Sequence, residues 1–234
     1  MSDKTIIQLD DSMLIGKGRD RACYQHPYNP TQCIKVALKT EKQSKREASY
    51  QKYLSKNGKN LSHICLYLGI VETNLGLGYI FNLATDDQNR PAPTLKAAIQ
   101  KKLIDKKEAL KVSDSLKMYL LEENICVYDL SPSNISVYQT NQNIWGFKII
   151  DGIGLAKPNP LIIRSKKLTQ NLNRKSLKRF HRKLENEFKH AELGIKPSPK
   201  IRKSQKQQIV EKTIQSLIVV LGFICIAYLA ALII

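Results

Sequence analysis

The sequence is poor in the residues that mark secreted, fibrous or disordered proteins. Its five cysteines form no CxxC pair and their odd number gives no disulfide framework, so we expect reduced cytosolic thiols. Eleven glycines and nine prolines in 234 residues exclude a collagen-like or uniformly disordered chain. A basic start followed by a short apolar stretch, the pattern of a secretory signal, is also missing. The length leaves room for one modest globular domain with an appendage.

Acidic residues are scarce in the second part of the chain. Residues 157–212 contain 17 basic and 4 acidic side chains, whereas residues 1–156 contain 21 and 16. The formal net charge of +18 predicts an anionic partner, such as nucleotide phosphates, nucleic acid or a lipid surface. We interpret residues 157–212 as a basic helical arm and linker. The arm is helical in propensity near residues 168–190 but so basic that it should bury little.

Residues 213–234 form an uncharged, mostly apolar run of 22 residues. At about 1.5 Å per residue, a helix of this length crosses a hydrocarbon core of about 30 Å. A buried core helix is the alternative, but such a helix is seldom apolar on every face. We therefore predict a C-terminal transmembrane anchor, with the preceding domain in the cytoplasm and the basic arm near anionic lipid headgroups.

The apolar pattern divides residues 1–156 into a strand-rich half and a mainly helical half. In the first half it predicts a helix over residues 42–56 and strands within residues 4–15, 22–24, 33–38, 64–71 and 79–83. In the second half it predicts helices over residues 94–103 and 106–124, then short strands near 135–138 and 145–150.

Two features of the strand-rich half indicate an anion site. Gly16 and Gly18 lie in a turn between expected strands, where missing side chains let the backbone approach a phosphate. An ordinary hairpin turn has the same pattern. Lys35 stands inside an apolar strand, so its ammonium needs a carboxylate and an anionic ligand, unless it lies at a strand edge with its stem reaching solvent. Glu47 on the following helix is the expected carboxylate.

Two acidic turns follow in the second half. Asp129 and Asn134 stand five residues apart between a helix and a strand, and Asp151 leaves the last expected strand. Such groups can supply oxygen ligands to Mg²⁺ and accept a proton from a hydroxyl group. Separately each is typical of a turn or a local cap. Together, and in this order, they favour phosphoryl transfer.

In their order the motifs resemble those of protein-kinase-like phosphotransferases over about residues 12–156. The blocks at residues 15–27 (IGKGRDRACYQHP), 33–36 (CIKV) and 71–79 (VETNLGLGY) are similar to the PhoP regulatory network protein YrbL family of bacteria. The resemblance implies an α+β, bilobal protein-kinase-like fold with a reduced C-lobe, followed by the basic helical arm and the transmembrane helix. The N-lobe would span about residues 1–85 and the C-lobe about residues 86–156.

The resemblance also implies a role for each candidate residue in binding ATP and Mg²⁺. Gly16 and Gly18 would cover the phosphates, and Lys35 would contact them while paired with Glu47. Asp129 would be the catalytic base. Asn134 and Asp151 would hold Mg²⁺.

Departures from the kinase pattern bear on activity. Val127 and Tyr128 precede the catalytic Asp where kinases usually have His-Arg, and Ser131 stands where a lysine is common. The missing lysine removes a positive charge that would stabilise the transferring phosphoryl group, which predicts a slow enzyme. The metal motif reads Asp-Gly-Ile-Gly instead of Asp-Phe-Gly. No Ala-Pro-Glu segment follows it, which argues against a conventional protein substrate.

Three hypotheses follow. The leading one is a membrane-tethered, kinase-like phosphotransferase that transfers the γ-phosphate of ATP to an unidentified hydroxyl acceptor, a protein or a membrane-associated small molecule. The alternative is a pseudokinase scaffold that binds a regulatory partner without turnover. A third gives the function to the basic arm, which would bind anionic lipid. Nucleic acid is disfavoured because the arm offers few aromatic side chains, only Phe180 and Phe188, for base stacking.

Overall fold

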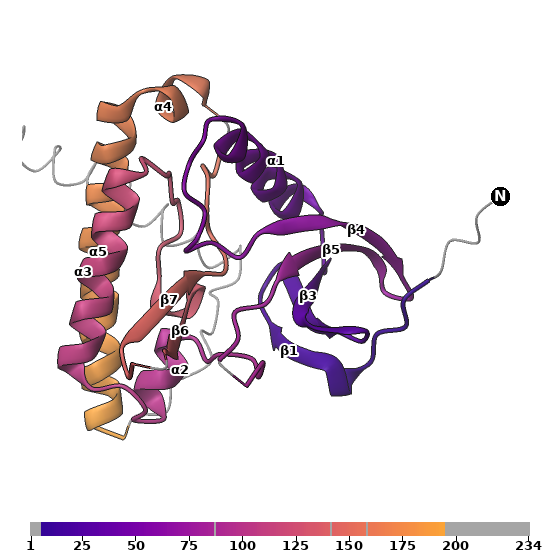
Figure 1. Ribbon diagram of the computed structural model, residues 1–234, viewed down its shortest axis with the longest axis horizontal. Coiled ribbons are helices and arrows are strands. Elements are labelled where there is room, and N and C mark those ends of the chain that lie inside the picture. Colours follow the sequence, from indigo (N-terminus) through magenta and orange to yellow (C-terminus); the bar gives the residue numbers. More distant parts are fainter. Residues whose placement is uncertain (1–5, 87, 141, 158, 195–234) are drawn as a thin grey trace, which may run out of the picture. The chain divides into compact units, whose positions relative to one another are not determined.

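The computed structural model describes residues 6–86, 88–140, 142–157 and 159–194, which belong to one compact unit that ends at Ile195. The first half of this unit is a five-stranded antiparallel sheet with the strand order β1-β2-β3-β5-β4 (Figure 1). The strands are β1 (Leu14–Lys17), β2 (Arg21–His26), β3 (Asn29–Ala37), β4 (Tyr67–Thr73) and β5 (Gly76–Asn82).

The first strand is shorter than the strand predicted within residues 4–15. A 3₁₀ helix, η1 (Asp11–Met13), interrupts the segment because the Asp10 carboxylate accepts a hydrogen bond from the Ser12 amide at 2.8 Å. Strand β1 therefore begins only at Leu14. Before it, Ile7 forms an isolated parallel bridge with Thr73.

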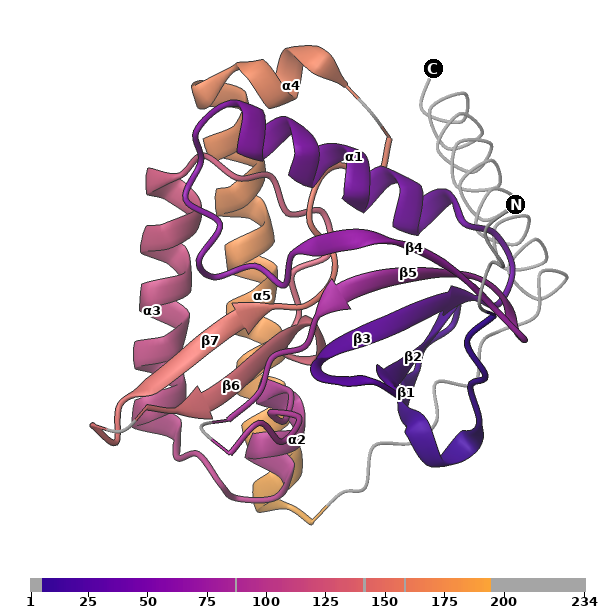
Figure 2. The same cartoon turned by 45° about the vertical axis from the view of Figure 1, so that its right-hand side comes forward.

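Helix α1 (Lys42–Lys56) follows the predicted bounds and runs alongside β4 (Figure 2). Its buried side chains include Glu47, Tyr50 and Leu54, which recur at intervals of three and four residues and so share one face. The Tyr50 hydroxyl accepts a hydrogen bond from the Cys126 amide at 2.8 Å. The helix thereby connects the sheet to the second half of the fold.

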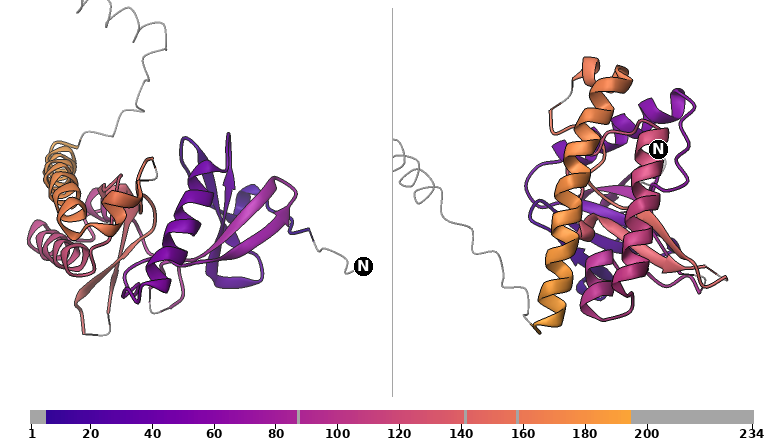
Figure 3. Two further views of the ribbon diagram at one scale, coloured as in Figure 1. Left: turned by 90° about the horizontal axis from the view of Figure 1, so that it is seen from above. Right: turned by 90° about the vertical axis from the view of Figure 1, so that its left-hand side faces the viewer.

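The second half consists of helices around a small two-stranded sheet, which together confirm the predicted α+β class. Helices α3 and α5 lie side by side (Figure 3), and the hairpin β6–β7 packs against them. The elements are α2 (Leu95–Gln100), α3 (Lys106–Glu122), η2 (Pro132–Asn134), β6 (Ile135–Gln139), β7 (Trp145–Ile149), α4 (Pro160–Arg164) and α5 (Lys166–Glu192).

Helix α5 corrects the prediction that the basic segment would bury little. Phe180, Leu184 and Phe188 lie in the main hydrophobic core together with residues of α1, α2, α3, β6 and β7. The buried positions of α5 recur every three or four residues, whereas its many cations stand between them. The segment is thus an amphipathic core helix with a basic outer surface.

The part of the predicted arm and linker that follows residue 194 and the predicted transmembrane helix at residues 213–234 lie outside the described residues. Within the part of the chain that the structure describes, no helix is both long and apolar enough to cross a bilayer.

Candidate functional site

The two acidic turns predicted from the sequence touch each other. The amide of Tyr128 donates to the Gly152 carbonyl at 3.0 Å, and the Asn134 side-chain amide donates to the Asp129 carbonyl at 2.8 Å. Gly152 has a φ of +84°, and a Cβ at this position would lie 2.4 Å from the Asp129 carbonyl oxygen. Glycine follows Asp151 because only a residue without a side chain allows this approach.

Lys35 joins the sheet to the same place. Its Nζ donates to the Ile150 carbonyl at 2.6 Å, one residue before Asp151, and lies 4.3 Å from the centre of the Phe81 ring. The residue is only 7% exposed. Burial and the nearby Arg21 charge oppose protonation, but the carboxylates of Asp151 and Glu47 outweigh them and raise the pKa of Lys35. The lysine is therefore a buried cation directed toward the acidic turn.

The predicted ion pair between Lys35 and Glu47 is wrong, because Glu47 is paired with Arg21. The two guanidinium nitrogens of Arg21 lie 2.9 and 3.2 Å from the two Glu47 carboxylate oxygens. Arg21 stands on β2, two residues from Cys23, which is the register partner of Lys35, so both cations project from the same face of the sheet. The planar fork of arginine suits a carboxylate better than an ammonium does.

Arg21 also binds the second acidic group of the site. Its Nη2 lies 2.7 Å from Asp151 Oδ1, which also accepts hydrogen bonds from the Gln43 side chain at 2.8 Å and from the Gly152 amide at 2.6 Å. Sequence reasoning missed both Arg21 and Gln43. The signal for Arg21 was strand alternation. Arg21 stands two residues before Cys23 and so shares its face of the sheet, which is also the face of Lys35, the register partner of Cys23.

The carboxylates of Asp151, which is partly buried, and Glu47, which is fully buried, have opposite electrostatic properties. Burial opposes ionisation of Asp151, but the charges of Lys35 and Arg21 outweigh it and hold the pKa of Asp151 well below its ordinary value. Burial, followed by the negative charge of Asp151, raises the pKa of Glu47. Asp151 thus keeps a fixed negative charge at neutral pH.

Asp129 occupies a different environment. Its side chain is 54% exposed, and the nearest ion-pair partner is Lys183 on α5, with Nζ 3.5 Å from Oδ1. In the turn after β1, the pKa of Arg19 is raised chiefly by its hydrogen bond with Asp20, and the charge of Asp129 contributes further. Sequence reasoning missed Lys183, because it assigned residues 157–212 to an arm outside the domain.

Gly16 lies within β1, opposite Cys23 of β2, and not in the predicted turn, whereas Gly18 lies in the turn between β1 and β2. The Gly18 amide donates to the Arg21 carbonyl at 2.8 Å, as in a hairpin turn, and a Cβ at Gly16 would meet nothing within 4 Å. Both glycines are exposed. The space beside Gly16 on β1 is therefore open to a ligand, and the geometry at Gly18 is that of an ordinary turn.

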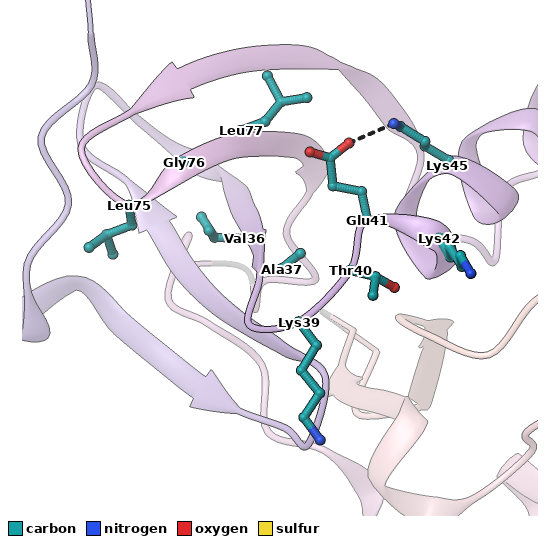
Figure 4. A pocket seen from close by; sticks show the side chains of 10 residues that line it. All are labelled: Val36, Ala37, Lys39, Thr40, Glu41, Lys42, Lys45, Leu75, Gly76 and Leu77. Carbon is teal, nitrogen blue, oxygen red and sulfur yellow. Dashed lines mark ion pairs between the residues drawn. The ribbon is translucent and has the colours of Figure 1, made fainter.

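A separate cavity of about 360 Å³ lies between the end of β3, the start of β5 and the first turn of α1 (Figure 4). Its lining includes Lys39, Lys42 and an ion pair of 2.8 Å between Glu41 and Lys45. The ten lining residues include none of the predicted site residues. The cavity is therefore distinct from the place where Lys35 meets the acidic turns.

These features define an α+β protein in which a buried lysine of an antiparallel sheet reaches an Asp-Gly turn of a helical half. The chain belongs to the PhoP regulatory network protein YrbL family, whose profile matches residues 7–188. The YrbL proteins of Escherichia coli (strain K12) and Shigella flexneri are each 29% identical over 184 residues, which cover 75% of this chain and 86% of theirs.

A solved structure also aligns with the chain. The crystal structure of Rad53 1-466 in complex with AMP-PNP superposes with a TM-score of 0.48 and 15% sequence identity. The alignment covers 86% of this chain and 55% of that chain, so the protein spans about half the length of this solved structure.

Proposed function

We propose that the protein is a kinase-like phosphotransferase that uses ATP and Mg²⁺. The observation that carries the proposal is the convergence of Lys35, Asp129 and Asp151, which are far apart in the sequence, at the contact between the sheet and the two acidic turns. Asn134 lies at the same contact, because its carbonyl accepts a hydrogen bond from the Ile150 amide at 3.0 Å. This is the set of groups that phosphoryl transfer needs.

The sheet would supply the cations that bind the phosphates. Lys35 makes its hydrogen bond with the neutral Ile150 carbonyl, whereas Arg21 neutralises Glu47. The ammonium of Lys35 is therefore not committed to an ion pair among the described residues, and an incoming phosphate oxygen can replace the carbonyl as its partner. The exposed backbone at Gly16 would cover the phosphates from the hairpin side.

The donor set of the acidic turns suits Mg²⁺. Asp151 offers an ionised carboxylate and Asn134 an amide oxygen, which are the hard ligands that this ion prefers. Within the described ranges, no three His, Cys, Asp or Glu side chains cluster closely enough to hold a metal by themselves. Mg²⁺ usually completes its shell with phosphate oxygens and water, so two protein ligands are sufficient. When bound, the ion would neutralise charge on the phosphates.

Asp129 would accept the proton of the attacking hydroxyl group. Its carboxylate is half-exposed and so accessible to an acceptor, while its backbone is fixed by Asn134 and Gly152. The acceptor oxygen forms a bond to the γ-phosphorus, and the bond from that phosphorus to the bridging oxygen of ADP breaks. The proton of the hydroxyl passes to an Asp129 oxygen.

The test is turnover of γ-labelled MgATP by the 234-residue protein in detergent micelles, with water, lipids and proteins as acceptors. We expect Asp129→Asn to lower the rate by roughly 100-fold or more, since it removes the proton acceptor. Asp114→Asn, an exposed carboxylate on α3, is the matched control and should leave the rate unchanged. Equal rates for Asp129→Asn and the wild type would contradict the proposal, and MgATP binding without turnover would establish the pseudokinase alternative.

We further propose that residues 213–234 anchor the protein in a membrane, with the basic surface of residues 157–212 on anionic headgroups. The support is the uncharged run of 22 residues and the net charge of +13 that precedes it. Flotation with vesicles should require residues 213–234 even at 1 M salt, a concentration at which headgroup attraction alone is screened. Loss of flotation at high salt with these residues intact would contradict an inserted helix.

A further inference from the structure

Helix α5 holds the segment that leads to Asp129 through side-chain hydrogen bonds. The Asn173 amide donates to the Ile125 carbonyl at 2.7 Å and to the Leu120 carbonyl at 3.2 Å. The Ser176 hydroxyl donates to the Val127 carbonyl at 3.1 Å. These are buried contacts at successive turns of one helix, so the helix fixes the path of the backbone into the proposed catalytic loop.

Lys183 continues this series at the proposed base itself. Its Nζ lies 3.5 Å from Asp129 Oδ1 and 3.3 Å from the Leu130 carbonyl, to which it donates a hydrogen bond. The neighbouring Leu184 is fully buried, as is Phe180 one turn earlier. The rotation of α5 about its axis is therefore set by the core, and the core directs Lys183 toward Asp129.

Two ion pairs hold the same part of the helix against the rest of the fold. Glu185 pairs with Lys106 at 2.9 Å, and Glu187 pairs with Lys96 at 3.1 Å. Both glutamates lie within about one helical turn after Lys183. The ammonium is thus presented by an anchored helix, although its side chain is 45% exposed.

Stability does not account for this placement. An ion pair of 3.5 Å between two half-exposed groups contributes little to folding, because water screens the charges and both side chains lose freedom. A second observation indicates a role for the Lys183 charge in catalysis. Ser131 stands two residues after Asp129, where kinase-like enzymes commonly have a lysine, so the loop itself provides no cation at this point.

We propose that Lys183 is a catalytic residue whose ammonium contacts the phosphoryl group during its transfer and supplies, from α5, the positive charge missing at Ser131. The inference rests on the proposed phosphotransferase function. Lys183 stays protonated throughout, and the proton of the acceptor hydroxyl still goes to Asp129. The contact strengthens as charge spreads over the phosphoryl oxygens, so it acts mainly on the rate of the chemical step.

The experiment compares Lys183→Met, which keeps the size and removes the charge, with Lys183→Arg, which keeps the charge. Lys178→Met is the matched control, because Lys178 is an exposed cation on the same helix and lies about 140° away from Lys183 around its axis. We expect Lys183→Met to lower kcat about 100-fold with little change in the KM for MgATP. Lys183→Arg should restore at least a tenth of the wild-type kcat, and Lys178→Met should leave both kcat and the KM for MgATP unchanged.

A second readout needs no acceptor. Aluminium tetrafluoride with MgADP mimics the transferring phosphoryl group, and we expect Lys183→Met to weaken binding of this complex at least tenfold while the affinity for MgADP alone stays the same. If the wild type binds the mimic but turns over no ATP, the phosphotransferase proposal fails and the catalytic role of Lys183 fails with it, and the weaker binding of Lys183→Met then shows only a contact with the phosphoryl position. If turnover is present and Lys183→Met behaves as Lys178→Met in both assays, the Lys183 proposal is overturned alone.

Absence of both ATP turnover and binding of the mimic by the wild-type protein would overturn both proposals. Thermal unfolding checks that each variant is folded. Should Lys183→Met fail to fold, Lys183→Gln takes its place in the comparison with Lys183→Arg, and the same outcomes decide.

Discussion

The two aspartates of the site are held in opposite ways. Asp151 is fixed by Arg21, Gln43 and the Gly152 amide, all within 2.8 Å of one carboxylate oxygen. Asp129 is half-exposed, and its ion-pair partner lies 3.5 Å away. A carboxylate surrounded by cations and donors keeps its charge, whereas an accessible carboxylate with a loose partner can exchange a proton with a substrate.

This difference suits the two carboxylates to different roles in the proposed reaction. The lowered pKa of Asp151 suits a permanent ligand for a cation. The exposure of Asp129 suits a proton acceptor, and its position is secured through the backbone instead of the side chain. Ion pairs and hydrogen bonds to its carboxylate hold Asp151 in place, whereas hydrogen bonds of the backbone hold the loop around Asp129.

Removing the cation that holds Asp151 should have the largest effect. Arg21→Met leaves the Glu47 and Asp151 carboxylates without the cation that contacts both of them directly, and breaking a buried ion pair in this way costs about 3–5 kcal/mol. Urea unfolding at pH 7 measures the loss. Glu47→Gln in the same chain removes one of the two charges and should recover part of the stability. Full stability of the single variant would show that Arg21 does not organise this region.

The contact between the two regions is the next target. Gly152→Ala places a Cβ 2.4 Å from the Asp129 carbonyl oxygen at a φ of +84°, so the turns must separate and the protein should lose about 3 kcal/mol. Gly58→Ala is the control, since its φ of +63° carries similar strain but its Cβ would meet nothing within 4 Å. We expect the control to lose only about 1 kcal/mol in the same unfolding experiment. Equal losses would mean that the approach of the two turns is not tight.

The sequence predicts where Asp151 lies, but it does not predict that Arg21 is the cation that contacts Asp151. Lys35 stands within an apolar strand, Asp151 follows the end of another, and Asp129 lies in the loop between an apolar helix and a strand, so the sequence pattern places each of them in a recognisable segment. The partner of Glu47 does not follow, because Arg21 and Lys35 project from the same face of neighbouring strands. Only the distances between atoms decide which cation binds the carboxylate.

The Asp129 region was harder to predict because half of its support comes from α5. Averaged over residues 157–212, a net charge of +13 indicates a solvated arm. The average conceals a stripe of buried residues at three- and four-residue intervals, which includes Asn173, Ser176 and Phe180. A basic helix can bury one face while its cations occupy the others, so Lys183 reaches Asp129 only once the rotation of the helix is known.

The smallest expected effect on stability is that of Asp129→Asn, and it is best compared with the effect of Asp151→Asn. Asp129→Asn should change the free energy of unfolding by no more than about 0.5 kcal/mol, because its ion pair is loose and exposed. Asp151→Asn should instead destabilise the protein at pH 7, since Arg21 and Lys35 lose a counter-charge. A carboxyl group with a lowered folded-state pKa contributes stability above its unfolded-state pKa, and this stability is lost as the pH falls.

The deficit of Asp151→Asn should therefore shrink between pH 6 and pH 3, about the range in which an unfolded aspartate becomes protonated. Asp129→Asn, which loses only a loose and exposed ion pair, should stay within about 0.5 kcal/mol of the wild type at each pH. Urea midpoints across this range measure both variants, with Asp114→Asn as the exposed control. If Asp129→Asn and Asp151→Asn show the same pH dependence, the two carboxylates share one electrostatic environment, and their division into a fixed ligand and a proton acceptor has no physical basis.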